Sequence, residues 1–145
     1  GELAAYRNMI QQFLKPGKIV ACVSDSYDIY NAIQNLWGEE LREEVKNSGG
    51  TLVIRPDSGN PVEVVLKCLR ILEDKVGMTK NLKGFKQLPS YFRLIQGDGV
   101  NRDSIREILE EMLRLNYSAS NITFGMGGGL LQQINRDTQK YAYKC

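Results

Sequence analysis

The residues of this chain that could do chemistry gather in four short segments rich in Asp, Gly and Ser. Each segment follows a predicted strand, and the four are 24–28, 55–59, 96–99 and 125–129. Carboxylates can bind sugar hydroxyls or a metal ion, glycine N–H groups can bind phosphate, and arginine can bind a charged or planar partner. Together the segments offer the groups that a phosphorylated sugar needs.

Segment 125–129 has four glycines in five residues and precedes a predicted short helix. Backbone N–H groups and the helix dipole can together hold a phosphate, and Gly127, Gly128 and Gly129 are the candidates. Arg136, about two helical turns further on, could fold back toward this phosphate, although exposed arginine is the commoner case. A tight turn is the alternative for the glycines. A dinucleotide fingerprint is not supported, because the spacing departs from G-x-G-x-x-G.

Asp98 lies between two glycines, Gly97 and Gly99. Because neither neighbour has a side chain, a ligand can approach the backbone closely, and the carboxylate suits a ribose diol. The alternative is that Asp98 serves only as a turn or helix-capping residue, which single aspartates often do.

Segments 55–59 and 24–28 add an arginine and several acids. Arg55 ends a strand predicted to be buried, where a guanidinium must find an anion or an aromatic partner. Asp57 could instead bond to the backbone of a rigid turn. One polar residue of 24–28 must cap the next helix, and Asp28 in the first helical turn also favours the helix dipole. Spacing alone therefore gives Asp28 no catalytic role.

Composition limits the possible functions. The 145 residues, 42% of them hydrophobic, suffice for one globular domain. A net charge of only +2 gives no strong field for nucleic acid or an anionic membrane. The absence of histidine removes the commonest general base and the commonest metal ligand. Proton chemistry must therefore use carboxylates, or groups outside this sequence.

Three cysteines, Cys22, Cys68 and Cys145, form no CxxC pair, and two lie in apolar runs. We interpret them as reduced thiols of the core. No apolar stretch approaches the roughly 20 residues that span a bilayer, and the N-terminus lacks the pattern of a signal peptide. These features predict a cytoplasmic protein.

Alternating strand and helix patterns must position the four segments. Continuous apolar runs predict strands at 18–23, 51–54, 92–95 and 121–124. Helical spacing of apolar residues predicts helices over 3–13, 29–45 with a bend near Gly38, 62–76 and 105–112. Asn60 and Pro61 are the N-cap and first-turn proline of the third helix, and Ser104 with Glu107 is a capping box for the fourth. A loop of about 14 residues follows Gly77.

This alternation implies an α/β fold whose parallel strands are joined by right-handed crossovers. Half of an eight-stranded barrel and a small doubly wound sheet are the two candidates, because a complete barrel takes about 250 residues. Residues 1–145 form a single segment whose two ends look truncated, which favours the half barrel. In either fold the four segments meet at the carboxyl edge of the sheet, where such folds bind ligands.

Four sequence strings, in this order, closely resemble the nicotinate/nicotinamide phosphoribosyltransferase family, and its nicotinamide-using members in particular. The strings are VSDSYDIYN at 23–31, IRPDSGNP at 54–61, IQGDG at 95–99 and FGMGGGLL at 124–131. The resemblance, over about residues 18–145, implies four parallel β-α units of an irregular (β/α) barrel of the type II phosphoribosyltransferase kind. It also implies a homodimer, Mg²⁺, and ATP coupled through a phosphorylated histidine. The implied reaction is displacement of pyrophosphate from 5-phosphoribosyl-1-pyrophosphate by nicotinamide, which forms nicotinamide mononucleotide for NAD biosynthesis.

The resemblance implies a role for each matching residue. Asp28 would orient the catalytic histidine of the family, and Asp57 would bind ribose or the metal-bound diphosphate; these two are the catalytic candidates. The substrate-binding candidates are Ser24 beside the nicotinamide tunnel, Arg55 and Asp57 at the pyridine and diphosphate, Gly97 and Asp98 at the ribose hydroxyls, and Gly127, Gly128 and Arg136 at the 5′-phosphate. The histidine of the family, and the acid that reads the amide, lie upstream of this sequence.

Two other functions stay open. Nicotinate phosphoribosyltransferase shares the barrel and the phosphosugar chemistry, and a non-catalytic phosphosugar-binding module would suit a short chain without histidine. We expect small-molecule substrates and neither nucleic acid nor membrane as a partner. We also expect the isolated segment to be inactive, because half a barrel leaves sheet edges unpaired.

Overall fold

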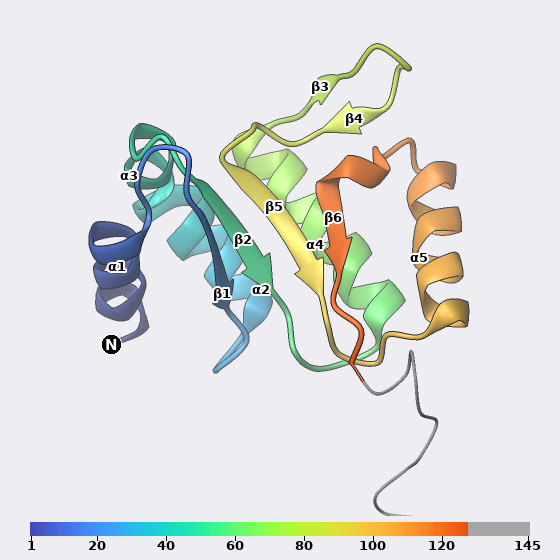
Figure 1. Cartoon of the computed structure of the whole chain (residues 1–145), viewed down its shortest axis with the longest axis horizontal. Helices are drawn as coiled ribbons and strands as arrows, with labels where there is room; N and C mark the ends of the chain where they lie inside the picture. The colour runs from blue at the N-terminus through green and yellow to red at the C-terminus, as the bar shows by residue number, and fades with distance from the viewer. Residues whose placement is uncertain (128–145) are drawn as a thin grey trace, which may run out of the picture.

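The parallel sheet predicted from the sequence is present. The structure is a computed structural model that describes residues 1–127. Its main sheet has the strand order β1-β2-β5-β6, with every pair parallel. The strands are β1 (Ile19–Val23), β2 (Thr51–Arg55), β5 (Phe92–Gln96) and β6 (Ile122–Phe124). The α/β fold class with four parallel strands is therefore confirmed (Figure 1).

The helices lie where the apolar pattern predicts them, with one difference. The helical segments are α1 (Glu2–Phe13), α2 (Ile29–Asn31), the π-helix η1 (Ala32–Glu40), α3 (Arg42–Asn47), α4 (Pro61–Val76), α5 (Arg102–Arg114) and the 3₁₀-helix η2 (Ala119–Asn121). The helix predicted over 29–45 is thus three segments with a π-helical middle. A Cβ on Gly38 would lie 2.6 Å from the Ile33 carbonyl oxygen and 2.9 Å from Lys75 Cβ. Helix α4 packs this closely only because Gly38 has no side chain.

The start of α4 is confirmed and the start of α5 is corrected. Asn60 caps α4 by accepting hydrogen bonds from the N–H groups of the next turn, and Pro61 is the first helical residue. Helix α5 begins earlier than the capping box expected at Ser104 and Glu107. Asn101 is its N-cap, and Ser104 is the residue that bonds back to it, with 2.9 Å in each direction. A serine here does what Glu or Gln does in the usual motif.

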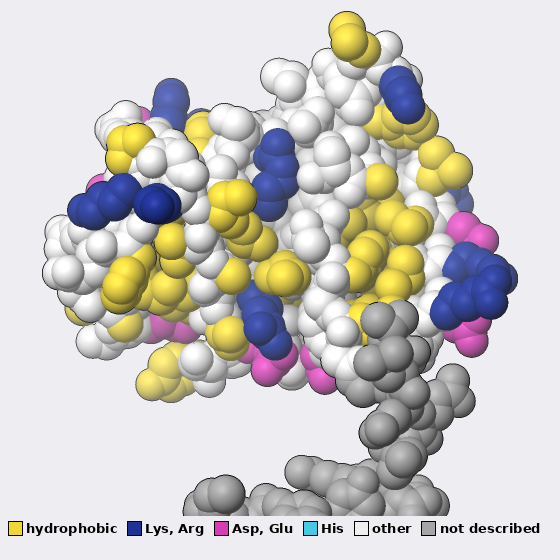
Figure 2. All heavy atoms as spheres, in the orientation of Figure 1, with side chains coloured by type: hydrophobic (Ala, Val, Ile, Leu, Met, Phe, Trp, Pro, Cys, Tyr) yellow, Lys and Arg dark blue, Asp and Glu magenta, His cyan; other side chains and the backbone are white. Residues whose placement is uncertain are grey.

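Each new strand joins the sheet beside the previous one, so the order of the described strands never reverses. A doubly wound sheet reverses its strand order at the point where its ligand binds. Helices α2 and α4 lie behind the sheet in Figure 1, and none of the helices formed by residues 1–127 lies in front of the face toward the viewer. Hydrophobic side chains appear on this open face in Figure 2. Ile19 and Val23 alternate with the buried Cys22 along β1 and therefore point to the open face, where they are 74% and 44% exposed.

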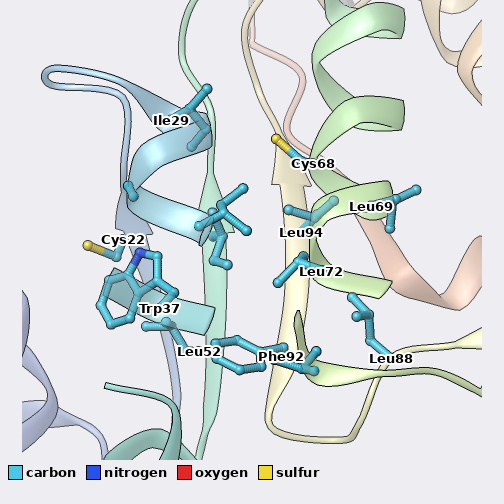
Figure 3. Packing of buried hydrophobic residues seen from close by; sticks show 14 of the residues in the cluster. Cys22, Ile29, Trp37, Leu52, Cys68, Leu69, Leu72, Leu88, Phe92 and Leu94 are labelled. Atoms are coloured by element: carbon cyan, nitrogen blue, oxygen red, sulfur yellow. The ribbon is translucent and has the colours of Figure 1, made fainter. Parts of the chain in front are cut away.

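The core fills the space between the sheet and the helices behind it. Leu52 of β2 and Phe92 and Leu94 of β5 point toward this space, and all three are at most 1% exposed (Figure 3). Leu72 of α4 and Trp37 of η1 cover them and are fully buried. The buried thiols Cys22 and Cys68 belong to the same cluster, as predicted, whereas Cys145 lies outside the described residues.

The loop predicted after Gly77 contains a small antiparallel hairpin, formed by β3 (Thr79–Lys80) and β4 (Lys86–Gln87). Asn81 holds its turn, because the side-chain oxygen accepts hydrogen bonds from the N–H groups of Lys83 and Phe85, both at 3.0 Å. Two-residue strands are too short to show an alternating pattern, so the sequence did not reveal this hairpin.

Glu73 of α4 anchors the hairpin to the rest of the domain. Its carboxylate accepts hydrogen bonds from Lys86 Nζ at 2.8 Å and from the Tyr117 hydroxyl at 2.6 Å. The Lys86 ammonium also lies 4.2 Å from the centre of the Tyr117 ring. Burial alone would raise the pKa of Glu73, but these two donors outweigh it and hold the pKa below its ordinary value.

We predict that Glu73→Gln lowers the free energy of unfolding at pH 7 by about 1 kcal/mol, a modest value because the pair is partly exposed. A carboxyl whose pKa is depressed in the folded state stabilises above its unfolded pKa and loses this effect on protonation. The difference between parent and variant should therefore shrink as the pH falls below 4.5, the ordinary pKa of Glu73. Denaturant unfolding of the parent protein and the variant at several pH values measures this difference in unfolding free energy. The control is Asp74→Asn, at an exposed neighbouring position, and an equal loss at pH 7 and pH 3 would contradict this role.

Candidate functional site

The turns that follow β1, β2, β5 and β6 meet at the carboxyl edge of the sheet, as the sequence predicts. The Ser24 N–H donates to the Arg55 carbonyl oxygen at 3.1 Å, and the Gly125 N–H donates to that of Gln96 at 2.9 Å. A Cβ on Gly125 would lie only 3.7 Å from Gly97 Cα. Figure 2 shows basic and acidic side chains next to one another at the edge where β2 ends.

Arg55 is placed to bind an anion. Its Nη2 is 3.4 Å from Asp57 Oδ1, which is a long contact for an ion pair, and its Nε is buried without a hydrogen-bond partner among residues 1–127. The guanidinium lies over Gly97, since a Cβ there would be 3.3 Å from Nη2 and 3.6 Å from Cζ. A buried donor that lacks a partner is costly, so a ligand that satisfies it would bind favourably.

Asp25 joins the turn after β1 to the turn after β2. Its Oδ2 accepts a hydrogen bond from the Asp57 N–H at 2.8 Å and another from the Ser58 hydroxyl at 2.6 Å. Sequence reasoning considered Asp25 only as one possible helix cap. The available signal was that segment 24–28 holds two acids, of which one at most is needed as the cap.

Asp28 is the residue that caps the helix. Its Oδ1 accepts hydrogen bonds from the N–H groups of Tyr30 at 2.9 Å and Asn31 at 3.2 Å. Its Oδ2 accepts no hydrogen bond from the part of the chain described, and the residue is exposed. One oxygen is thus used by the fold, and the orientation of a histidine by Asp28 stays a prediction.

The Ser24 hydroxyl has two partners inside the protein. It accepts a hydrogen bond from Trp37 Nε1 and donates one to the Cys22 carbonyl oxygen, both at 3.0 Å. Trp37 in turn stacks on Tyr6 of α1, with ring centres 4.4 Å apart. Ser24 is completely buried and therefore links the end of β1 to the core. Its predicted position beside a nicotinamide tunnel stays a prediction.

Gln96 supports the turn that carries Asp98. It is completely buried at the end of β5, and its Nε2 donates to the Asp98 carbonyl oxygen at 2.8 Å. Asp98 itself is exposed, and Gly99 has a positive φ of 62° that favours glycine. The sequence analysis missed Gln96, although a polar residue in register with the buried Phe92 and Leu94 was a visible signal.

The phosphate-binding candidates fall at the limit of the described chain. Gly127 is exposed, and no heavy atom lies within 4 Å of the place where its Cβ would be. Gly128 and Arg136 lie outside the described residues. Their proposed contacts with a 5′-phosphate therefore stay predictions.

Three further observations concern other kinds of site and membrane-spanning helices. A groove of about 650 Å³ between the hairpin and α5 is lined by apolar residues such as Phe85, Leu109 and Leu113, but by no acid and no arginine. The hairpin that borders this groove lies at the end of the sheet away from the turns (Figure 1). Between residues 1 and 127 no three His, Cys, Asp or Glu residues cluster as a metal site would require. None of the helices in this part has the length and apolar character needed to cross a bilayer.

Comparison with known proteins agrees with the geometry. Residues 1–145 match the family described as the nicotinate phosphoribosyltransferase (NAPRTase) family. A protein of Xanthomonas campestris pv. campestris (strain 8004) named nicotinamide phosphoribosyltransferase is 58% identical over 144 residues, which cover 99% of this chain and 31% of that protein. Proteins of the same name from Mycoplasma pneumoniae and Mycoplasma genitalium are 34% and 31% identical, and the matches cover 99% of this chain and 34% of each protein. The chain spans about a third of the length of the curated relatives it matches.

Proposed function

The chain belongs to the nicotinate phosphoribosyltransferase family, and from this we propose that it forms the phosphoribosyl-binding part of an enzyme of NAD biosynthesis. The reaction transfers the phosphoribosyl group of 5-phosphoribosyl-1-pyrophosphate to the ring nitrogen of nicotinamide, forming nicotinamide mononucleotide and pyrophosphate. The observation that carries the proposal is Arg55, whose buried Nε finds no partner among the described residues, beside Asp57 and over Gly97. The names of the relatives suggest the acceptor.

Arg55 and Asp57 act at the bond that breaks. Departure of pyrophosphate leaves positive charge at the ribose C1′ and adds negative charge to the leaving group, so both signs of charge must be stabilised. The Arg55 guanidinium binds the diphosphate and also contacts the planar nicotinamide. The nearby Asp57 carboxylate binds ribose or the metal-bound diphosphate.

Residues at the other two turns hold the remainder of the donor substrate. The exposed Asp98 carboxylate and the Gly97 backbone bind the ribose hydroxyls, and Gln96 supports this turn from the core. The N–H groups of Gly127 and Gly128, together with Arg136, bind the 5′-phosphate. Binding at both ends of the sugar fixes C1′ in position for attack by the acceptor.

The residues present fit Mg²⁺ as part of a substrate complex. Mg²⁺ usually keeps several waters and binds through one or two carboxylates together with substrate phosphates, so a three-carboxylate cage is not required. Asp57 is 48% exposed and keeps a carboxylate available for this purpose. Bound Mg²⁺ would neutralise charge on the diphosphate. ATP coupling requires the histidine of the family, which is not in this sequence. Asp28 would orient that histidine once it is supplied from outside the segment.

The proposed architecture is the irregular barrel expected from the sequence. Two features support the barrel. The strands join the sheet without a reversal of order. Ile19 and Val23 are exposed on the open face, which further strands of a barrel would cover. We also propose that the protein forms a homodimer. We further propose a cytoplasmic location, which the free, buried thiols of Cys22 and Cys68 support.

We predict that Asp57→Ala and Asp98→Ala each lower nucleotide formation by about 10²-fold or more in the full-length polypeptide that carries this segment. Each change removes a carboxylate that binds the donor substrate near the reacting carbon. Mononucleotide production from nicotinamide and 5-phosphoribosyl-1-pyrophosphate measures the effect. Asp103→Asn, at an exposed position in the first turn of α5, is the matched control. Near-normal turnover in both alanine variants would refute the assignment.

The acceptor can be tested separately, because the family description names nicotinate whereas the relatives are named for nicotinamide. We predict that kcat/KM for nicotinamide exceeds that for nicotinate by at least about 10²-fold, since an acid that reads the amide repels a carboxylate. Competition between the two acceptors measures this ratio. A preference for nicotinate would make the protein a nicotinate phosphoribosyltransferase.

Calorimetric binding of the donor substrate without any product would indicate a non-catalytic module.

A further inference from the structure

Asp25 is the side chain through which the turn after β1 holds the turn after β2. The ladder between these strands ends at the pair Val23 and Arg55. Beyond it, the Ser24 N–H still bonds to the Arg55 carbonyl oxygen at 3.1 Å. The Asp25 carboxylate continues this connection past the sheet, to the N–H of Asp57 at 2.8 Å and the hydroxyl of Ser58 at 2.6 Å.

Because Asp25 bonds to the Asp57 N–H and the Ser58 hydroxyl, it leaves the Arg55 guanidinium available to a ligand. The Oδ2 atom of Asp25 accepts from a backbone N–H and a hydroxyl, and among residues 1–127 the ion pair of Arg55 is with Asp57, not with Asp25. The carboxylate contact of Arg55 is the long one of 3.4 Å to Asp57. An acid that bonded directly to Arg55 would compete with a substrate anion for the guanidinium. Asp25 therefore orders the turn without occupying its arginine.

We infer that Asp25 is a positioning residue for the transfer reaction, which acts by fixing the backbone at Asp57 and thereby the places of the Asp57 carboxylate and the Arg55 guanidinium. The inference rests on the proposed function for its catalytic consequence. Its structural part, the bond that orders the Asp57 N–H, stands independently of the reaction. Asp25 acts through these two groups and does not itself contact the substrate or the reacting atoms.

The test compares Asp25→Ala, Asp25→Asn, Ser58→Ala and the double variant Asp25→Ala with Ser58→Ala in the full-length polypeptide. An amide oxygen can accept the same two hydrogen bonds, so Asn preserves positioning but removes the charge. Ser26→Ala is the matched control, because Ser26 is exposed in the same turn and its hydroxyl has no hydrogen bond within residues 1–127. The readouts are kcat, KM for 5-phosphoribosyl-1-pyrophosphate, thermal unfolding, and amide hydrogen exchange at Asp57.

We expect Asp25→Ala to lower kcat by about 10²-fold, the usual cost of a misplaced reacting group. Asn should restore activity to within about threefold of the parent, since a neutral acceptor keeps a weaker form of both bonds. Adding Ser58→Ala to Asp25→Ala should change kcat by less than about twofold, because both changes remove the same hydrogen bond. Exchange at the Asp57 N–H should accelerate in the alanine variant, with little change in the variant that carries Asn.

Two results would overturn the inference. If Asn is as damaging as Ala, the charge of Asp25 acts directly on substrate or metal. If Asp25→Ala lowers the unfolding temperature while kcat stays at the parental value, the residue only stabilises the fold. A parent protein that forms no nucleotide refutes the proposed function instead; unchanged exchange at Asp57 in Asp25→Ala would then refute the inference, and accelerated exchange would support it.

Discussion

The parallel register of the strands determines where chemistry can occur in this domain. Val23 pairs with Arg55 and Gln96 pairs with Phe124, so neighbouring strands end at the same level. Parallel strands send their following turns to one edge of the sheet, and residues far apart in the sequence thus come together. Nothing about Arg55, Asp57 or Asp98 would suggest a shared site if these strands ended at different heights.

A set of polar residues beneath this edge keeps the turns in place. Ser24 bonds to Trp37 in the core, Gln96 bonds to the Asp98 backbone, and Asp28 caps the helix that follows β1. Each of these side chains bonds to the protein itself, although Asp28 Oδ2 and the buried Gln96 Oε1 accept no hydrogen bond from residues 1–127. The side chains of Arg55 and Asp98 remain exposed or only partly satisfied, which is the arrangement of groups that await a ligand.

The sequence was sufficient for the features that depend on local pattern. Apolar runs revealed the four strands, and Asn60 with Pro61 revealed the start of α4, because an N-cap and a first-turn proline are local signals. The π-helical segment has no local signal of this kind, and the close approach of Gly38 to Lys75 joins residues that are far apart in the sequence. The hairpin was hidden because its strands are two residues long.

Local sequence pattern likewise reveals only part of the candidate site. Motif resemblance and residue type identified Arg55, Asp57 and Asp98 as candidates. The partners of Asp25 lie 32 and 33 residues away, and no local pattern announces a hydrogen bond across that separation. The supporting role of Gln96 likewise depends on which face of β5 is buried.

We propose that Arg55 at this edge binds the diphosphate of the donor substrate. Calorimetric titration of the Arg55→Lys variant with 5-phosphoribosyl-1-pyrophosphate tests it most directly, because lysine keeps the charge but loses the planar, forked donor set. Arg102→Lys, at an exposed position at the start of α5, is the matched control. We expect at least about tenfold weaker binding for Arg55→Lys and parental affinity for the control. Equal affinity of Arg55→Lys and the parent protein would contradict it.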